Sequence, residues 1–439
     1  MPKRSYFQDI AGVLGSNVFT LLTNFGLVIL LSRLLGTEGY GFYTALIVVP
    51  TLVVSFFQMG IRPTTVFLIG SGREDENNLV SAMLTILIFT SVLGVIFSAA
   101  AYALIGTKGY TPALLAMALT TIPMRLTTIY AGGVFLGKEE IPKANMMNWL
   151  TGLFTLLLAV AMVYFLKLGL FGAVASLLMG NTVVALLAIS MLLRRFKTRL
   201  SVKNPLILKM LGTGVVYALS FLTIQFNYRI DVVLLKVLSV PREVGIYSLG
   251  VSVAEMLWQI PLAIGVVVMS RSANATDKNM LNQSTARLLR ISLIAGIIIS
   301  AAIVLFSPLL VPLIFGTEYL PSVRVMQTIM PGIIMIIAFR VLSGQLAGAG
   351  RPDAALKAFA PALLVNVVLN YLWIPGYGAN GAVMATNVSY TLASVIYLFV
   401  FSRISGMPVK EIFRFGKEDW SFVKRFIDRE KKPESRIER

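Results

Sequence analysis

The chain has no cysteine and no histidine among its 439 residues. Disulfide bonds, thiolate nucleophiles, zinc sites built from these residues and histidine general bases are therefore excluded. Charge is also scarce, because 13% of the residues are charged and only 20 acidic residues accompany 38 basic ones. With 57% hydrophobic residues and a mean hydropathy of +0.81, the composition excludes a soluble domain and favours a polytopic membrane protein.

The apolar residues fall into segments that are long enough to cross a bilayer, which takes about 20 residues per helix. Twelve such segments lie at 10–34, 41–70, 78–104, 112–136, 143–166, 169–193, 207–238, 243–270, 285–315, 322–350, 354–374 and 378–402. The sequence therefore predicts an all-α polytopic membrane protein with 12 transmembrane helices. No cleavable signal is expected, because the first segment is too long for a signal core.

The basic residues between these segments predict the orientation. If the N-terminus lies inside, the inner connections hold 28 of the 38 Lys and Arg residues and the outer ones hold 6. This bias predicts a plasma-membrane protein with both termini in the cytoplasm. The net charge of +18 is explained by this topology, so nucleic acid is not expected as a partner.

The sequence also matches itself. Residues 36–43 (GTEGYGFY) resemble residues 240–247 (VPREVGIY) at an offset of 204, and Gly137-Lys138 resembles Gly350-Arg351. Six helices per copy is an even number, so the copies share one orientation about an axis along the membrane normal. We predict two pseudo-symmetric six-helix lobes around a central cavity, at 1–200 and 201–405, and a basic amphipathic cytoplasmic tail at 406–439.

Four polar residues interrupt the apolar stretch Phe221 to Leu235. At about 100° per residue, Gln225 and Arg229 share one face of the helix, and Asn227 and Asp231 lie nearly opposite. Polar groups at this depth usually face a cavity or a partner, because burying them in hydrocarbon is costly. One face is suited to an anion and the other to a cation or proton.

Basic residues outnumber acids inside the spans. Only Asp231 and Glu255 are acids well inside, whereas four arginines lie there, namely Arg62, Arg125, Arg229 and Arg340. Gln58 precedes Arg62 by four residues, as Gln225 precedes Arg229. Guanidinium groups match phosphate oxygens in a bidentate fork, so a cavity lined by these side chains is suited to a pyrophosphate or another polyanion. The alternative is that Arg62 or Arg229 pairs with an acid or reaches the interface.

Two carboxylate–amide pairs at helical spacing, Asp231 with Asn227 and Glu255 with Gln259, indicate ion coupling. Their oxygens suit Na⁺, and a buried carboxylate can carry H⁺. The alternative is that each acid neutralises an arginine. No other cofactor and no resident metal are expected.

The stretch Leu31 to Tyr43 (LSRLLGTEGYGFY) resembles the first loop of polysaccharide flippases, the Wzx-like branch of the multidrug/oligosaccharidyl-lipid/polysaccharide exporter superfamily. Arg229-Ile230-Asp231 and Val244 to Ser248 resemble the signature of the second lobe. The resemblance implies alternating access by two six-helix lobes. It also implies that a polyprenyl-pyrophosphate-linked oligosaccharide moves from the cytoplasmic to the outer leaflet, with the four arginines along the path of the diphosphate and sugar. The implied partners are this lipid-linked glycan, the bilayer, and glycosyltransferases or a polymerase of the same pathway.

Two rival functions are weighed against this one. A cation-coupled multidrug exporter of the same superfamily needs an acidic cavity, which the excess of arginine argues against. A membrane-embedded glycan polymerase or ligase needs a large outer loop, but the predicted outer connections run only to about ten residues. We therefore expect a transporter rather than an enzyme.

Overall fold

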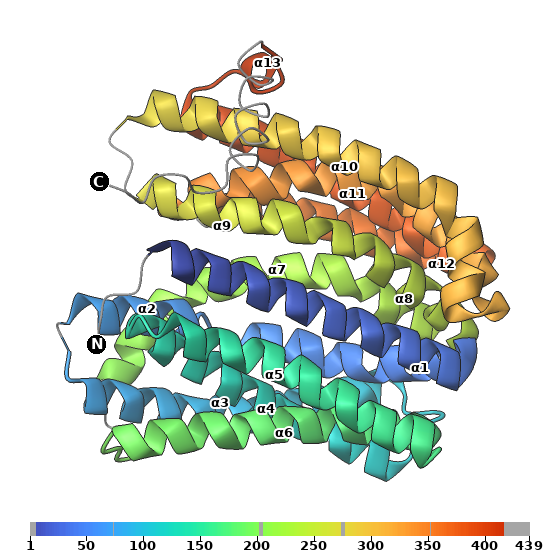
Figure 1. The fold of residues 1–439 in the computed structure, drawn as a ribbon, viewed down its shortest axis with the longest axis horizontal. Helices are drawn as coiled ribbons and strands as arrows, with labels where there is room; N and C mark the ends of the chain where they lie inside the picture. The colour runs from blue at the N-terminus through green and yellow to red at the C-terminus, as the bar shows by residue number, and fades with distance from the viewer. Residues whose placement is uncertain (1–5, 73, 202–204, 274–276, 352, 417–439) are drawn as a thin grey trace, which may run out of the picture.

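The computed structural model describes residues 6–72, 74–201, 205–273, 277–351 and 353–416, and every regular element in these ranges is a helix. Within these described ranges, ten helical segments are long and apolar enough to cross a membrane. The long helices lie side by side along the longest axis of the molecule (Figure 1). This confirms the all-α, multi-pass prediction.

The helices follow one another through the chain with short connections. They are α1 (Tyr6–Phe57), α2 (Ile61–Ser71), α3 (Glu76–Ile105), α4 (Pro112–Gly137), α5 (Ile141–Ala159), η1 (Val160–Phe165), α6 (Gly169–Arg195), α7 (Leu206–Leu238), α8 (Pro241–Glu255), η2 (Met256–Trp258), α9 (Gln259–Ala273), α10 (Lys278–Phe315), η3 (Thr317–Tyr319), α11 (Leu320–Gly348), α12 (Asp353–Ser405) and α13 (Val409–Ile412).

Two of these helices each contain a non-helical glycine between two predicted spans. Gly36 in α1 has φ 66° and ψ −178°, and Gly378 in α12 has φ 53° and ψ −130°. Residues other than glycine rarely adopt a positive φ, so each glycine allows a sharp change of direction. The predicted span 41–70 is wrong in one respect, because positive φ values at Met59 and Gly60 separate α1 from α2.

The predicted span 243–270 is also interrupted. The 3₁₀ turn η2 at Met256–Trp258 divides it into α8 and α9. Pro261 lies just beyond this turn, and a proline both lacks a backbone donor and crowds the carbonyl four residues earlier, here that of Leu257. The side chain of Trp258 is therefore presented from a local irregularity in the helix.

The packing falls into two groups that meet along α1, α7 and α8. Helices α3 to α6 pack among themselves and against α1, whereas α9, α10 and α12 pack around α11. One end of the bundle carries the α4–α5 connection and the end of α6, and we call it the basic end (left in Figure 1). The other end, with the α3–α4 connection and η3, is called the opposite end. Of the predicted basic amphipathic tail at 406–439, residues 417–439 lie outside the described residues.

Candidate functional site

A cavity of about 170 Å³ lies where α1 meets α7 and α8. Its walls carry one charged group, Arg229, and several hydroxyl groups. The lining residues are Tyr43, Thr44, Ile47, Val48, Thr51, Arg229, Val232, Tyr247, Ser248, Val251 and Ser252. The first half of the chain thus supplies one wall and the second half supplies the other.

Two different polar environments lie on the two faces of α7. On one face, Gln225 donates a hydrogen bond to Ser55 Oγ of α1 at 3.4 Å, and Arg229 lines the cavity. On the other face, Asn227 donates to Ser389 Oγ of α12 at 2.6 Å, and Asp231 is fully buried. One face of α7 therefore points between the two halves, and the other points into the second half.

Arg229 is held by Glu255 of α8. Its Nη2 lies 2.8 Å from Oε2 of Glu255, and its Nη1 donates to Oε1 at 3.3 Å. This two-pronged contact is the alternative that the sequence left open for Arg229. The carboxylate offsets the charge that Arg229 presents to the cavity.

The other three arginines have separate surroundings, and none of them is among the residues that line the cavity. Arg125 of α4 donates to Thr51 Oγ1 at 2.9 Å and therefore lies directly behind the cavity wall. Arg340 of α11 lies over the rings of Tyr228 and Trp258. Arg62 of α2 is partly buried, with its backbone against Gly133.

Of the four arginines, Arg229 lines this cavity and Arg125 lies behind its wall, so a shared anion path along all four stays a prediction. Spacing along a helix gives the depth of a side chain in the membrane, but the direction of that side chain depends on packing with other helices. Gln58 illustrates this point, because it lies in the turn after α1 and donates to the backbone carbonyl of Ser55 at 3.2 Å. Ser55 thus lies between Gln58 and Gln225.

Asp231 is the centre of a buried polar cluster in the second half. Its carboxylate accepts hydrogen bonds from Tyr247 at 2.7 Å, Asn370 at 2.6 Å and Thr386 at 2.9 Å. Asn370 also donates to Oδ1 of Asn366 at 3.0 Å. The oxygens Oδ1 of Asn227 and Oδ1 of Asn370 are buried with no hydrogen-bond partner in the described structure. The cluster therefore offers carboxylate and amide oxygens to a small cation or a proton.

The halves are tied together at the opposite end. Arg33 of α1 donates to the backbone carbonyls of Leu313 and Ile314 at the end of α10. Tyr319 donates to the carbonyl of Gly36 at 2.8 Å. These bonds connect residues about 280 positions apart and close the opposite end of the bundle beyond the cavity.

Two glycines make the closest approach between the halves. A Cβ added to Gly41 would overlap the carbonyl oxygen of Pro241, and one added to Gly245 would overlap that of Thr37. The contact is reciprocal, because Gly41 and Gly245 are 204 residues apart, and so are Thr37 and Pro241. Thr44 and Ser248 have the same separation, and their hydroxyl oxygens are 3.2 Å apart. The two copies of the repeated sequence thus meet each other across a local two-fold relation.

Sequence reasoning missed the hydroxyl lining of the cavity. Thr44 and Ser248 lie just beyond the two matched stretches, three residues after Gly41 and Gly245, so extending the match would have identified them. Thr51 and Ser252 carry no such signal, since isolated hydroxyl residues in apolar helices are common and often bond to their own backbone.

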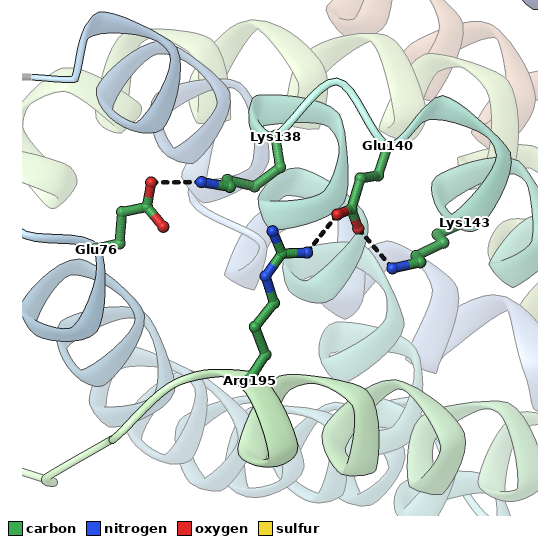
Figure 2. Close-up of polar contacts among 5 residues, drawn as sticks. All are labelled: Glu76, Lys138, Glu140, Lys143 and Arg195. Carbon is green, nitrogen blue, oxygen red and sulfur yellow. Dashed lines mark hydrogen bonds and ion pairs between the residues drawn. The ribbon is translucent and has the colours of Figure 1, made fainter. Parts of the chain in front are cut away.

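Ion pairs fix the first half at the basic end (Figure 2). Lys138 at the end of α4 contacts Glu76 at the start of α3 at 2.5 Å. Glu140 contacts Arg195 of α6 and, at 2.9 Å, Lys143 of α5. Partial burial alone would raise the pKa of Glu140, but the hydrogen bonds from Lys143 and Arg195 outweigh it and lower the pKa. These contacts join the ends of four helices.

The fold and the cavity define a polytopic membrane protein of the transporter class. A family model described as "Polysaccharide biosynthesis protein" matches residues 7–271, and the chain belongs to this family. A second model, MatE, matches residues 217–372. These matches confirm the resemblance that the loop after the first span indicated.

Relatives extend the comparison. An uncharacterized membrane protein of Methanocaldococcus jannaschii is 21% identical over 91% of this chain and 99% of its own length. A probable low-salt glycan biosynthesis flippase of Haloferax volcanii, Agl15, is 22% identical over 46% of this chain and 43% of its own length.

Two solved structures share the fold. The lipid II flippase MurJ in an inward closed conformation has a TM-score of 0.75 and 14% identity, covering 96% of this chain and 93% of its own. An inward-facing multidrug resistance transporter of the MATE family has a TM-score of 0.74 and 16% identity, covering 92% of this chain and 99% of its own. The relatives with a named activity are flippases and transporters rather than enzymes.

Proposed function

We propose that this chain is a flippase that moves a polyprenyl-(pyro)phosphate-linked oligosaccharide from the cytoplasmic to the outer leaflet, for the synthesis of a cell-surface polysaccharide. The observation that carries this proposal is the cavity between the halves, with Arg229 in its wall and Arg125 directly behind Thr51. The family match and the named flippases among the similar proteins support it.

The same proposal includes the architecture and the orientation. If α1 and α12 each count as two spans, divided at Gly36 and Gly378, the helices make twelve spans in two lobes of six, at 1–200 and 201–405. The basic end is the cytoplasmic end, which the excess of Lys and Arg in its connections supports. The segment 406–439 then lies on the cytoplasmic side.

The mechanism is alternating access. The bonds at the opposite end close the cavity toward the outside, so the state described here takes up its cargo from the cytoplasmic side. The diphosphate enters the space between the lobes and meets guanidinium groups, which bind phosphate oxygens in pairs of hydrogen bonds. The lipid tail stays in the bilayer while the lobes rock. Opening the outer contacts then releases the headgroup on the other side.

A coupling ion drives the cycle in this proposal. Asp231 and the unpartnered oxygen of Asn227 form a Na⁺ or H⁺ site in the C-terminal lobe, while Glu255 links the site to the cargo. Movement of the Glu255 carboxylate away from Arg229 would remove the negative charge next to it and so strengthen its attraction for a diphosphate. Cargo and ion binding are then linked through one ion pair. Glycosyltransferases or a polymerase of the same pathway supply and consume the cargo.

The test is transport by purified protein in liposomes that contain a fluorescent polyprenyl-diphosphate oligosaccharide. We expect Arg125→Ala and Arg340→Ala to lower the transport rate by at least about tenfold, since a charge-assisted hydrogen bond contributes about 1.5–3 kcal/mol. Arg324→Ala is the matched control, because Arg324 is an exposed residue on the same helix as Arg340, and it should transport normally. Normal transport in both test variants would remove the anion site from the proposal.

A second candidate is a cation-coupled multidrug exporter. The MatE match to residues 217–372 and the MATE-family structure favour it. Against it, the cavity has no acid among its lining residues, and its charged group is Arg229. Transport of cationic dyes in the same liposomes, without transport of the lipid-linked glycan, would favour this alternative. A glycan polymerase or ligase would instead transfer sugars in detergent solution.

A further inference from the structure

Arg340 is held by aromatic rings. Its guanidinium carbon lies 5.2 Å from the ring centre of Tyr228 on α7 and 5.1 Å from that of Trp258 in η2. The two ring centres are 4.9 Å apart, with 39° between the ring planes, so one guanidinium group borders both faces. A cation over an aromatic face within about 6 Å is attracted by the negative face of the ring.

This arrangement differs from that of Arg229. Arg229 is paired with Glu255, whereas among the described residues no carboxylate lies within ion-pair distance of Arg340. An acid orients an arginine and also neutralises it. Aromatic rings orient an arginine and leave its charge available. The two neighbouring arginines of the second half are therefore held in chemically different ways.

The rings and the backbone around Arg340 are fixed by packing. Tyr228 is 4% exposed and Trp258 is 5% exposed, and the ring of Tyr390 packs on both. A Cβ on Gly265 of α9 would come within 2.6 Å of the carbonyl oxygen of Arg340, so α9 and α11 are in close contact at this point. The position of the guanidinium is thus set before any ligand arrives.

Donors without acceptors accumulate at the same place. Nε of Arg340, Nε1 of Trp258 and the hydroxyl of Tyr390 are buried with no hydrogen-bond partner in the described structure. Nitrogen–hydrogen groups of Arg and Trp can only donate, so their shared requirement is an acceptor. A buried donor without an acceptor is unfavourable, and an oxygen-rich anion supplies what is missing.

We propose that Tyr228 and Trp258 are positioning residues that hold Arg340 as an unneutralised cation for the diphosphate of the cargo. This rests on the proposed flippase function. When the halves move, the diphosphate takes its place beside the guanidinium, and its oxygens accept hydrogen bonds from Arg340. The rings keep the planar guanidinium in orientation without reducing its charge. Arg229, by contrast, becomes fully available only when its ion pair with Glu255 is broken.

The test measures binding of a polyprenyl diphosphate to the full-length protein in lipid nanodiscs. We expect Trp258→Leu and Tyr228→Leu to weaken binding at least about tenfold. Trp258→Phe and Tyr228→Phe keep an aromatic face and should bind within about threefold of the wild type. Thermal unfolding of each variant checks that the fold is retained. Equal affinity in the wild type and both leucine variants would overturn the proposal.

A second measurement covers the case in which the leucine variants do not fold. Tryptophans fluorinated in steps at position 258 keep the shape of the ring while its negative face weakens, so affinity should fall with each added fluorine if the ring acts through cation–π attraction. Affinity that is independent of fluorination would overturn the positioning role. If the wild type fails to bind polyprenyl diphosphate at all, the proposed function fails first, which separates the two conclusions.

Discussion

Replacing Gly41 with alanine tests whether the contact between the two halves at the opposite end controls access to the cavity. The added Cβ would overlap the backbone carbonyl of Pro241 and would lie 3.0 Å from the backbone nitrogen of Gly245. Backbone atoms cannot rotate away as a side chain can, so the helices must separate. Overpacking of this kind costs roughly 1–3 kcal/mol. At about 2 kcal/mol, the ratio of the closed to the open arrangement changes about 30-fold.

Cysteine cross-linking measures this ratio, and the chain is suited to it because it contains no cysteine of its own. Thr44 and Ser248 face each other with hydroxyl oxygens 3.2 Å apart, so Thr44→Cys with Ser248→Cys should form a disulfide under mild oxidation. A protease site engineered near residue 200 lets the two halves separate into two bands on a denaturing gel after cleavage, and the disulfide keeps them together as a single band. Adding Gly41→Ala should slow cross-linking about 30-fold, while reduction should restore transport to the cross-linked parent.

Two further variants complete this experiment. Because the contact is reciprocal, Gly245→Ala should act like Gly41→Ala, through overlap with the carbonyl of Thr37. Gly70→Ala is the control, since nothing lies within 4 Å of an added Cβ at that position. Unchanged cross-linking in both Gly41→Ala and Gly245→Ala would refute the reasoning, because the close approach would then have no bearing on how the halves separate.

Three other predictions concern charged groups. Asp231→Asn should abolish the stimulation of transport by a Na⁺ or pH gradient. The thermal midpoint should change little, because the amide keeps most of the hydrogen bonds from Tyr247 and its neighbours. Stimulation that persists in proteoliposomes would exclude Asp231 from coupling. Glu255→Gln should strengthen binding of a polyprenyl diphosphate about fivefold at low salt, since repulsion from a nearby carboxylate weakens the binding free energy of an anion by roughly 1 kcal/mol. An affinity equal to that of the wild type in the nanodisc titration would contradict this. Glu140→Gln should weaken the loss of folding stability at acid pH. The pKa of Glu140 is lowered in the folded state, so its contribution to the free energy of unfolding is present above the unfolded pKa of about 4.3 and is lost as the pH falls. Thermal unfolding of the variant and the wild type from pH 7 to 3 measures this difference.

Much of the fold was predictable from composition and pattern. Long apolar segments separated by basic connections allow few structures other than a helical membrane bundle. The interruption before Pro261 was harder to place than the bend at Gly36, because Gly36 lies between two predicted spans, whereas a helix end within a continuous apolar run depends on local φ values. Met59 is an example, since its positive φ has no signature in the sequence apart from the glycine that follows it.

The candidate site was predictable in its residue types but not in its pairing. Spacing alone separated Gln225 and Arg229 from Asn227 and Asp231, and these pairs do occupy different surroundings. It could not say that Glu255, 26 residues after Arg229, reaches it from the next helix. The partner of a side chain on a helix depends on the rotation and offset of neighbouring helices, which sequence spacing within one helix does not contain.

Arg229 and Arg340 show why this difference matters for function. In the sequence, both are single arginines in the middle of an apolar helix, and the pattern predicts the same anion path for both. In the structure, a carboxylate holds one and two aromatic rings hold the other. A transporter must bind a diphosphate firmly enough to select it and loosely enough to release it. An arginine without an acidic partner together with one that a neighbouring acid neutralises allows both, because making or breaking the ion pair between Glu255 and Arg229 changes the net attraction without moving Arg340 from its rings.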